Sequence, residues 1–391
     1  MEYVHVVVAA GTWEQDQLRY RRHRLAEFLL KKAGTKKVIW LCPGKQESVR
    51  ELPGGLTEWV IPDLLPHRVF RFGRYVDRFY KTKLRRIREY LEQLPDHTIC
   101  SLWYTFPGFP RLAEEIPWDQ IVYDCSDLWS SSIDGSHSWL MEFRQKVISE
   151  AEGRIAGSAD HIFCTSDFLA AHISASYDFK GEGIFTFENG VEYDLFAGET
   201  EKADIIRAGF DGPVLGFIGG IKPKLDFQLI KKAAQLKPDW LFLFVGPDGT
   251  KGDGAFTELQ AEPNIIWTGS VKPDQVPRYM NAIDIGIMPY KESPYNRAVF
   301  PLKLFEFLAA GKPVVGVNLP STEKYSREGI YSHLDYSDAE ALIASCEKLA
   351  AISDKETEGK RKQLAKAFDW ETVFERMAAI VLDEYPKPRA L

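Results

Sequence analysis

The most constraining feature of the sequence is a strand–loop–helix–strand unit between residues 283 and 315. Ile283–Pro289 is an apolar run typical of a buried strand, and Val314 begins another strand after Pro313. The pattern between them predicts a short helix that ends before Gly311, a residue type favoured just beyond a helix C-terminus. The apolar face of that helix consists of Leu304, Phe307 and Leu308. Units of this kind build α/β folds, which bring anions to the carboxyl ends of parallel strands.

Two charged residues fall near the start of this predicted helix. Lys303 and Glu306 are three positions apart and are therefore neighbours on one helical face. The lysine is suited to hold a phosphate, and the glutamate is suited to accept two hydroxyl hydrogen bonds from a ribose. The pair alone favours a plainer interpretation, an exposed ion pair that stabilises the helix by only about 0.2–0.5 kcal/mol.

The surrounding residues change that interpretation. The run Pro301-x-Lys303-x-x-Glu306-x-x-Ala309-x-Gly311-x-Pro313-Val-Val resembles the nucleotide-sugar site of glycosyltransferases with the GT-B fold, particularly glycosyltransferase family 4 and its relatives. The resemblance implies that Glu306 binds the donor ribose and that Pro301, Leu302 and Lys303 line the donor site. The first glutamate of the family's E-x7-E motif falls on Ala298, so the usual contact to the donor sugar is not carried over.

Length and composition are those of an ordinary globular protein with two domains. The chain has 391 residues, of which 45% are hydrophobic and 27% are charged. It has no apolar window long enough to span a membrane and no signal-peptide pattern at its N-terminus. The five cysteines are scattered and lack metal-type spacing. We therefore expect a cytoplasmic protein with free thiols.

The charge is distributed unevenly along the chain. Residues 1–100 hold 19 Lys and Arg against 12 Asp and Glu, a net charge of +7, whereas the whole chain has a net charge of −7. Much of the positive charge lies in residues 19–24 and 68–88, and the second segment runs into a predicted helix over 73–94. A basic, aromatic-rich helix fits an anionic membrane surface, and it equally fits a solvated face. The acidic pI of about 5.7 and the lack of a binding motif argue against nucleic acid as a partner.

The first half of the chain supplies the candidate acceptor side. Val4–Ala10 reads as a strand that ends in Gly11-Thr12-Trp13, where a sugar can approach the backbone or where the chain simply turns. Asp124 and Asp127 follow a later strand, at the edge where α/β proteins bind ligands, although aspartates there also cap helices. Tyr-Asp-x-x-Asp at this position resembles GT-B relatives in which an aspartate replaces the catalytic histidine. The resemblance makes Asp127 the candidate general base and Asp124 its orienting partner, with His137 and His161 as rivals.

The second half supplies the candidate donor side. The strand at 213–218 runs into Gly219 and Gly220, a loop that lets backbone amides approach a pyrophosphate. The family usually has an arginine and a lysine in this segment at a spacing that the chain does not match. Lys222 or Lys224 is a substitute, and Lys303 can share the role. Two further donor-site candidates follow later strands of this domain: Gly246 and Val271.

These observations predict an α/β protein of the GT-B class, with two Rossmann-like domains and parallel sheets facing across a cleft. We divide the chain into an acceptor domain (1–196), a nucleotide-sugar domain (197–367) and a C-terminal helix (368–391) that crosses back to the first domain. Trp370 and Phe374 are the expected interface residues of that helix.

The predicted function is transfer of a hexose from a nucleoside-diphosphate sugar, a UDP-sugar, to a hydroxyl of a lipid-linked cell-surface glycan such as teichuronic acid. We expect no cofactor besides this co-substrate, no metal because no Asp-x-Asp run is suitably placed, and peripheral contact with the inner face of the plasma membrane. Two alternatives remain: a sugar-nucleotide epimerase of the same architecture, and a non-catalytic nucleotide-sugar-binding scaffold.

Overall fold

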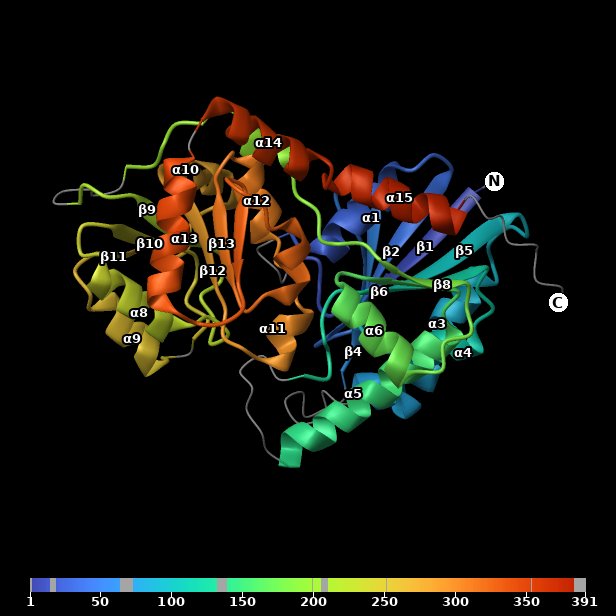
Figure 1. Ribbon diagram of the computed structural model, residues 1–391. Helices are drawn as coiled ribbons and strands as arrows, with labels where there is room; N and C mark the ends of the chain where they lie inside the picture. Colours follow the sequence, from blue (N-terminus) through green and yellow to red (C-terminus); the bar gives the residue numbers. More distant parts are fainter. Residues whose placement is uncertain are drawn as a thin grey trace. The chain divides into compact units, whose positions relative to one another are not determined.

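The computed structural model describes residues 2–14, 19–63, 73–131, 139–198, 200–204, 210–250, 252–352 and 354–382. The chain forms two compact units, each built around its own sheet (Figure 1). Unit 1 contains the described residues up to Glu188 and those from Val373 onward, and unit 2 extends from Asn189 to Thr372. The sequence-based division fell after Phe196, whereas the compact units divide after Glu188.

The sheet of unit 1 has the strand order β3-β4-β2-β1-β5-β6-β7-β8, and every neighbouring pair except β3 and β4 is parallel. The strands are β1 (Glu2–Val8), β2 (Thr35–Gly44), β3 (Ser48–Glu51), β4 (Leu56–Pro62), β5 (Thr98–Tyr104), β6 (Gln120–Cys125), β7 (His161–Cys164) and β8 (Gly183–Thr186). The accompanying helices are α1 (Arg21–Lys31), α2 (Gly73–Val76), η2 (Arg78–Tyr80), α3 (Lys81–Leu91), α4 (Arg111–Glu115), α5 (Trp139–Ser158), α6 (Asp167–Ser176) and α15 (Trp370–Leu382).

The strand β4 was not predicted, because residues 47–72 show an irregular pattern, with prolines and short apolar runs. Six of its seven residues are buried, and it pairs in parallel with β2. Glu58 interrupts the apolar pattern, yet it is only 1% exposed, because one carboxylate oxygen accepts from the Trp13 amide at 2.7 Å and the other from Arg50 Nε at 2.8 Å. Because this buried carboxylate is charged, the strand cannot be recognised from an apolar sequence pattern.

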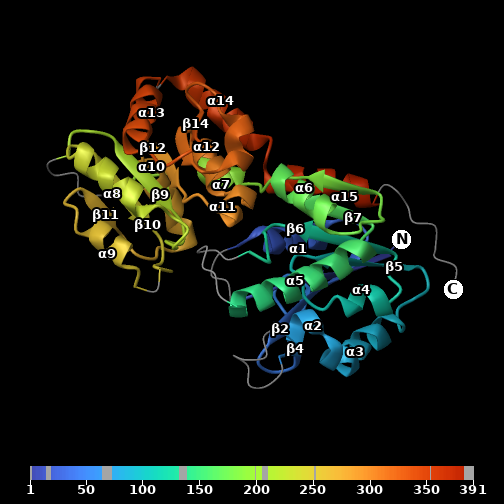
Figure 2. The ribbon, with the colours of Figure 1, turned by 60° about the horizontal axis from the view of Figure 1, so that its bottom comes forward.

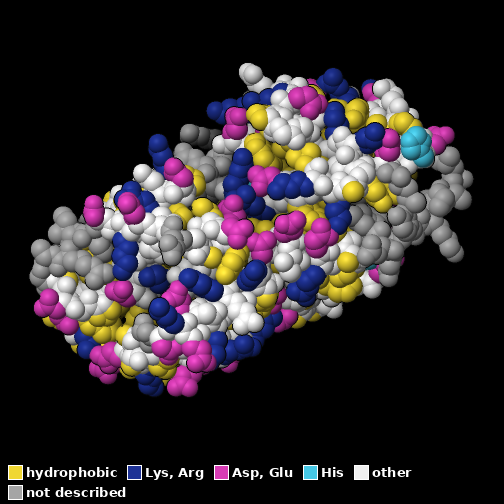
Figure 3. All heavy atoms as spheres, turned by 90° about the horizontal axis from the view of Figure 1, so that it is seen from above, with side chains coloured by type: hydrophobic (Ala, Val, Ile, Leu, Met, Phe, Trp, Pro, Cys, Tyr) yellow, Lys and Arg dark blue, Asp and Glu magenta, His cyan; other side chains and the backbone are white. Residues whose placement is uncertain are grey.

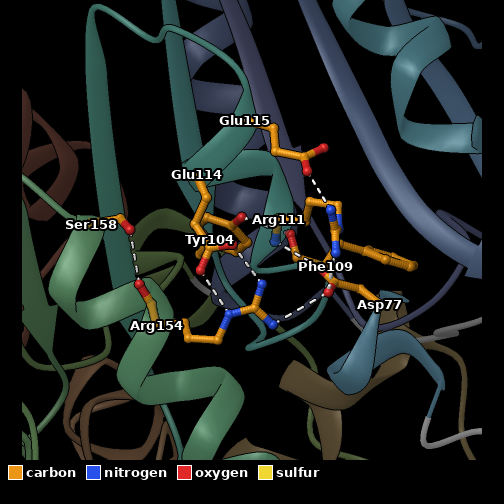
Figure 4. Close-up of polar contacts among 8 residues, drawn as sticks. All are labelled: Asp77, Tyr104, Phe109, Arg111, Glu114, Glu115, Arg154 and Ser158. Carbon is orange, nitrogen blue, oxygen red and sulfur yellow. Dashed lines mark hydrogen bonds and ion pairs between the residues drawn. The ribbon is translucent and has the colours of Figure 1, made fainter. Parts of the chain in front are cut away.

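The single helix predicted over residues 73–94 is wrong in its first turns. Asp77 has φ of 44°, a left-handed conformation that ends α2 and separates it from η2 and α3. Its buried carboxylate accepts from the Arg111 amide at 2.6 Å and lies 3.3 Å from Arg154 Nη1 (Figure 4). Burial raises the pKa of this carboxyl group, and the two arginines act against that rise. Contacts with α4 and α5 thus fix a helix break that local sequence does not indicate.

The sheet of unit 2 is entirely parallel, with the order β11-β10-β9-β12-β13-β14. Its strands are β9 (Val214–Ile218), β10 (Leu241–Val245), β11 (Ile265–Trp267), β12 (Ile285–Pro289), β13 (Val314–Val317) and β14 (Tyr331–Leu334). Its helices are α7 (Tyr193–Ala197), α8 (Phe227–Leu236), α9 (Gly254–Gln260), η3 (Pro273–Gln275), α10 (Val276–Ala282), α11 (Pro294–Ala298), α12 (Lys303–Ala309), η4 (Pro320–Tyr325), α13 (Ala339–Ala351) and α14 (Lys355–Lys366).

This strand order is that of a doubly wound fold, with its topological switch between β9 and β12. The helix α12 forms as the sequence predicts: Leu304, Phe307 and Leu308 are fully buried, and Gly311 follows the C-terminus with φ of +74°. The phenyl ring of Phe307 packs so closely on β12 that a Cβ at Gly286 would lie 2.6 Å from it. The helix is therefore held firmly against the sheet.

The C-terminal helix α15 begins in unit 2 and continues in unit 1. Trp370 packs against Gly190 in unit 2, where a Cβ on the glycine would lie 2.7 Å from the indole. Phe374 packs on Phe28 of α1, with ring centroids 5.6 Å apart, in unit 1. On the surface above α14 and α15, cationic and anionic side chains are interspersed (Figure 3). Within the described ranges, no helix is both long and apolar enough to cross a bilayer.

Candidate functional site

The candidate donor site in unit 2 lies at the carboxyl ends of the strands around the topological switch. Gly219 follows β9, Gly246 follows β10 and Tyr290 follows β12. Ligands of open α/β sheets bind at this position, because neighbouring loops diverge there and leave backbone groups accessible. The parallel sheet thus brings together loops that are separated by up to 71 residues in sequence (Gly219 to Tyr290).

Two of these loops touch through glycines. Gly219 and Gly246 have φ of +144° and +140°, a region that L side chains rarely adopt. A Cβ on Gly246 would lie 2.1 Å from the carbonyl oxygen of Gly219. The Gly219 amide donates to the Val245 carbonyl at 2.8 Å, and the Gly246 amide donates to the Gly269 carbonyl at 2.9 Å. Both glycines are therefore needed for the close approach of the two loops.

Lys303 extends over this glycine loop. A Cβ built on Gly219 would lie 2.8 Å from Lys303 Cε and 3.7 Å from its Nζ. The Nζ atom donates to Glu306 Oε2 at 3.0 Å, and the two side chains are 20% and 16% exposed. A partly buried cation–anion pair thus lies beside the glycine loop, which has no side chain at Gly219. Electrostatic interactions with a ligand are stronger at such a partly buried site than in water.

Tyr290 lies near the Lys303–Glu306 pair. Its ring is buried, and burial raises the pKa of the phenol to about 12. The charge of Lys303 lowers this pKa and the charge of Glu306 raises it, so both charged groups lie near the phenol. Sequence reasoning did not single out Tyr290 as a site residue. Its position directly after an apolar strand was the available signal.

Lys222 and Lys224 lie in the loop after Gly220. Lys224 Nζ lies 4.9 Å from the ring centroid of Tyr290 and 5.6 Å from that of Tyr295, both within cation–π distance. The Lys224 carbonyl accepts from the Lys291 amide at 3.0 Å, which joins the loops after β9 and β12. The alkyl chain of Lys222 covers Gly220 and Gly249. Both lysines therefore belong to the same loop cluster as Lys303.

The remaining donor candidates position this cluster. Pro301 is buried, and its carbonyl accepts from the Leu304 amide at 3.4 Å, while the Leu302 carbonyl accepts from the Glu306 amide at 3.3 Å. Val271 follows β11 and packs, half-buried, against the core of unit 2. Ala298, at the place of the family's first glutamate, is fully buried at the end of α11.

In unit 1 the candidate acceptor residues follow β1, at the switch between β1 and β5. The Gly11 carbonyl accepts from Trp40 Nε1 at 2.9 Å, and Thr12 lies next to Gly44. Trp13 packs edge-on against Trp40, and the Arg19 guanidinium lies 4.5 Å from its ring centroid. Trp13 also lines a pocket of about 620 Å³ between α1 and the β3–β4 hairpin, with Arg19, Glu27, Lys31 and Leu56 among the lining residues.

The two candidate catalytic aspartates have different surroundings. Asp124 is 1% exposed, and both of its carboxylate oxygens accept from Arg21 Nε at 2.9 Å. Asp127 is half-buried, and its carboxylate accepts from the Ser126 hydroxyl at 3.1 Å. Arg21 was noted only as part of a basic cluster, because its partner is 103 residues away. Of the rival histidines, His161 is buried in β7, with Nε2 3.3 Å from Glu182, and His137 lies outside the described residues.

Comparison with known proteins settles the family. A model described as glycosyl transferases group 1 matches residues 212–351, the part of unit 2 that contains the glycine loops and Lys303. A Bacillus subtilis protein, TuaH, provisionally named a teichuronic acid biosynthesis glycosyltransferase, is 51% identical over 380 residues, which cover 96% of each chain. The chain belongs to the group 1 glycosyltransferases. The family that the residues around Lys303 and Glu306 suggested is thereby confirmed.

Solved structures confirm the fold of this glycosyltransferase. Sucrose-phosphate synthase from Thermosynechococcus elongatus aligns with a TM-score of 0.74 at 15% identity, covering 97% of this chain and 98% of the other. HepE of Anabaena, solved with UDP and glucose, aligns with a TM-score of 0.64 at 14% identity, covering 96% and 98%. The predicted GT-B fold with two Rossmann-like units is confirmed.

Proposed function

We propose that this glycosyltransferase moves a hexosyl group from a UDP-sugar to a hydroxyl of a lipid-linked cell-surface glycan, such as teichuronic acid. The proposal is supported by the teichuronic acid pathway named for TuaH, the relative that matches 96% of this chain, and by the UDP bound in HepE. The observation that carries it is the Lys303–Glu306 pair beside the Gly219–Gly246 backbone contact.

The donor site follows from the chemistry of a nucleoside diphosphate. Lys303 neutralises charge on the diphosphate while Glu306 accepts hydrogen bonds from the two ribose hydroxyls. Lys222 or Lys224 supplies a second cation, and the amides after Gly219 contribute partial positive charge. During transfer the diphosphate leaves as an anion, so cations fixed beforehand stabilise the transition state more than the bound substrate. We propose that these groups suffice without a metal ion.

The acceptor side rests on Asp127. A carboxylate removes the proton from the attacking hydroxyl as the new glycosidic bond forms, and half-buried Asp127 is our candidate for this general base. The saturated ion pair of Asp124 with Arg21 is compatible with holding the end of β6 in place. Gly11, Thr12 and Trp13 are the proposed acceptor contacts, at the neighbouring strand end β1.

A lipid-linked acceptor requires contact with a membrane. We propose that the enzyme is cytoplasmic and binds the inner face of the plasma membrane through the basic segments of residues 1–100, a part of the chain with a net charge of +7. The helix α3 exposes Lys81, Arg85, Arg86 and Arg88, although Arg85 and Arg88 are paired with Glu89 and Glu92 at 3.2 and 2.7 Å. Its apolar residues Leu84 and Ile87 are buried, so α3 can offer charge but no apolar face.

The test is substitution of each donor-site charge. In Lys303→Ala and Glu306→Ala, kcat/KM for the UDP-sugar should fall at least tenfold, measured as UDP release with a polyprenyl-diphosphate-linked acceptor. The matched control is the Lys231–Glu258 pair of unit 2, which has the same 3.0 Å separation on an exposed surface. Lys231→Ala and Glu258→Ala should retain full activity. Full activity in both donor-site variants would overturn the proposal.

A further inference from the structure

The residue that follows β13 has a backbone conformation that suits glycine. Asn318 is 6% exposed and has φ of +57°, in the left-handed region. Asparagine tolerates this region better than most residues, but glycine adopts it at lower cost. The strands β9 and β10 of the same sheet are followed by Gly219 and Gly246, which also have positive φ. An asparagine after β13 therefore indicates a role for its side chain that glycine could not fill.

The side-chain amide of Asn318 joins two other loops. The strands β12, β13 and β14 are neighbours at one edge of the sheet of unit 2, so the residues that follow them meet (Figure 2). Asn318 Nδ2 donates to the Tyr290 carbonyl at 2.8 Å and to the Ser337 hydroxyl at 3.1 Å. A carbonyl oxygen can only accept, so the nitrogen of the amide must face Tyr290. Both hydrogens of that nitrogen are thereby used.

The contact with Ser337 continues to the loop after β9, which carries the two candidate lysines of the donor site. The Ser337 hydroxyl donates to Asp226 Oδ2 at 2.6 Å. The Asp226 amide donates to the Pro289 carbonyl at 2.7 Å, and the Lys224 carbonyl accepts from the Lys291 amide at 3.0 Å. The loop after β9 is therefore held against the loops after β12 and β14.

Tyr290 connects this network to the charged groups of the donor site. Its ring is 3% exposed, and Lys224 Nζ lies 4.9 Å from the ring centroid. The charges of Lys303 and Glu306 both act on the phenol. A shift of the Tyr290 backbone would move the ring against these groups, because a closely packed interior leaves no space to absorb it. The hydrogen bond from Asn318 to the Tyr290 carbonyl therefore helps to fix where the charged groups lie.

We propose that Asn318 is a positioning residue for donor binding. Its amide holds Tyr290 and, through Ser337, the loop of Lys222 and Lys224 in the arrangement that receives the diphosphate. This inference rests on the proposed function, because it takes the diphosphate of a nucleotide sugar as the ligand of those lysines. Loops that are fixed before the ligand arrives lose less conformational freedom on binding, so the contacts of Asn318 increase the affinity for the donor.

The test compares Asn318→Gly with Asn318→Ala in the full chain, by calorimetry with UDP and by UDP release from UDP-sugars. Both variants lose the amide, but glycine relieves the left-handed backbone whereas alanine strains it. Each should bind UDP about fivefold more weakly, as expected for a lost hydrogen bond, although Asn318→Ala should unfold at a lower temperature than Asn318→Gly. The KM for the UDP-sugar should rise by the same factor, while kcat changes by less than about twofold.

Asn264 provides the matched control in the same unit. It is 1% exposed, and its Nδ2 donates to the carbonyls of Ala234, Lys237 and Trp240, each at 3.0 Å. Asn264 and Trp240 directly precede β11 and β10, so this amide lies at the amino ends of the strands, opposite the donor site. Asn264→Ala should lower the unfolding temperature and leave the Kd for UDP at its wild-type value.

Two outcomes would overturn the positioning role: Asn318→Gly binds UDP as tightly as wild type does, or the UDP affinities of the three variants follow their unfolding temperatures. The second outcome would mean that Asn318 acts only through general stability. A wild-type protein that binds no UDP would overturn the proposed function together with this inference, so the failures of the two proposals give different results.

Discussion

The Nε atom of Arg21 donates to both carboxylate oxygens of Asp124 at 2.9 Å, in a pair that is almost fully buried. The same guanidinium donates from Nη1 to the carbonyls of Phe187 and Glu188, at 3.1 and 3.0 Å. It therefore ties the end of β6 to the last residues of unit 1 before the chain enters unit 2. One side chain of α1 thus joins two segments that are distant in sequence.

Removing this cation should destabilise unit 1. In Arg21→Met the carboxylate of Asp124 stays buried without its partner, which costs about 3–5 kcal/mol. The expected result is a lower midpoint of thermal unfolding for unit 1. Arg85→Met, which removes an exposed ion pair, should cost less than about 1 kcal/mol. Equal effects of the two substitutions would show that the buried pair has no special role.

Asp127→Asn should reduce turnover more than donor affinity. The amide keeps the size of the side chain but cannot take a proton, so kcat should fall about 100-fold or more while the Kd for UDP stays within about twofold. Asp124→Asn is the comparison variant. Because Asp124 pairs with Arg21, this substitution should lower the unfolding free energy as well as the activity. A wild-type kcat in Asp127→Asn would place the general base elsewhere.

Gly246→Ala should disrupt the donor loops. The added Cβ would meet the Gly219 carbonyl oxygen at 2.1 Å, at a φ of +140° that alanine disfavours. We expect a loss of at least about 2 kcal/mol of stability together with weaker UDP binding. Gly359→Ala in α14 is the control, because a Cβ there meets nothing within 4 Å. It should stabilise the protein by about 0.5–1 kcal/mol, and the reverse order of stabilities would contradict the account.

How well each element could be predicted from the sequence depends on how far apart in the chain its interacting residues lie. The helix α12 was predicted correctly because Leu304, Phe307 and Gly311 carry local signals of periodicity and termination. The strand β4 was missed because Glu58 is compatible with the core only through Arg50 and the Trp13 amide. These partners lie in other elements, beyond the reach of a local pattern.

In the candidate site, too, contacts between residues close in sequence were predicted and long-range contacts were not. Lys303 and Glu306 are three residues apart, and their pairing at 3.0 Å was expected from helical spacing. The contact between Gly219 and Gly246 joins two loops that only the parallel sheet brings together. The break at Asp77 depends on Arg111 and Arg154, and the role of Arg21 depends on Asp124. Such long-range polar pairs cannot be recognised from the periodicity of the sequence.

His5 should make the stability of unit 1 depend on pH. The imidazole is fully buried in β1, with Nδ1 2.5 Å from the Ser101 hydroxyl, and burial lowers its pKa to about 4 from an ordinary value of 6.5. A depressed folded-state pKa gives stability that is complete above pH 6.5 and is lost as the pH falls toward 4, by up to about 3 kcal/mol.

The variant His5→Asn isolates this contribution, because asparagine can still hydrogen-bond Ser101 but does not titrate. The difference in unfolding free energy between wild type and His5→Asn should shift by about 2–3 kcal/mol in favour of the variant between pH 7 and pH 4. Parallel stability curves across that range would mean that folding does not lower the pKa of His5.

The most direct test of the central claim is the thermal stability of the chain with UDP and a panel of UDP-sugars, in wild type and in Lys303→Ala. At 100 times its dissociation constant, a ligand of the folded protein stabilises it by about 2.7 kcal/mol, so the melting temperature of wild type should rise clearly. Lys303→Ala should show little or no rise at the same concentration, while Lys231→Ala should behave as wild type. A wild type that no uridine nucleotide stabilises, or a Lys303→Ala variant that UDP stabilises fully, would contradict the account.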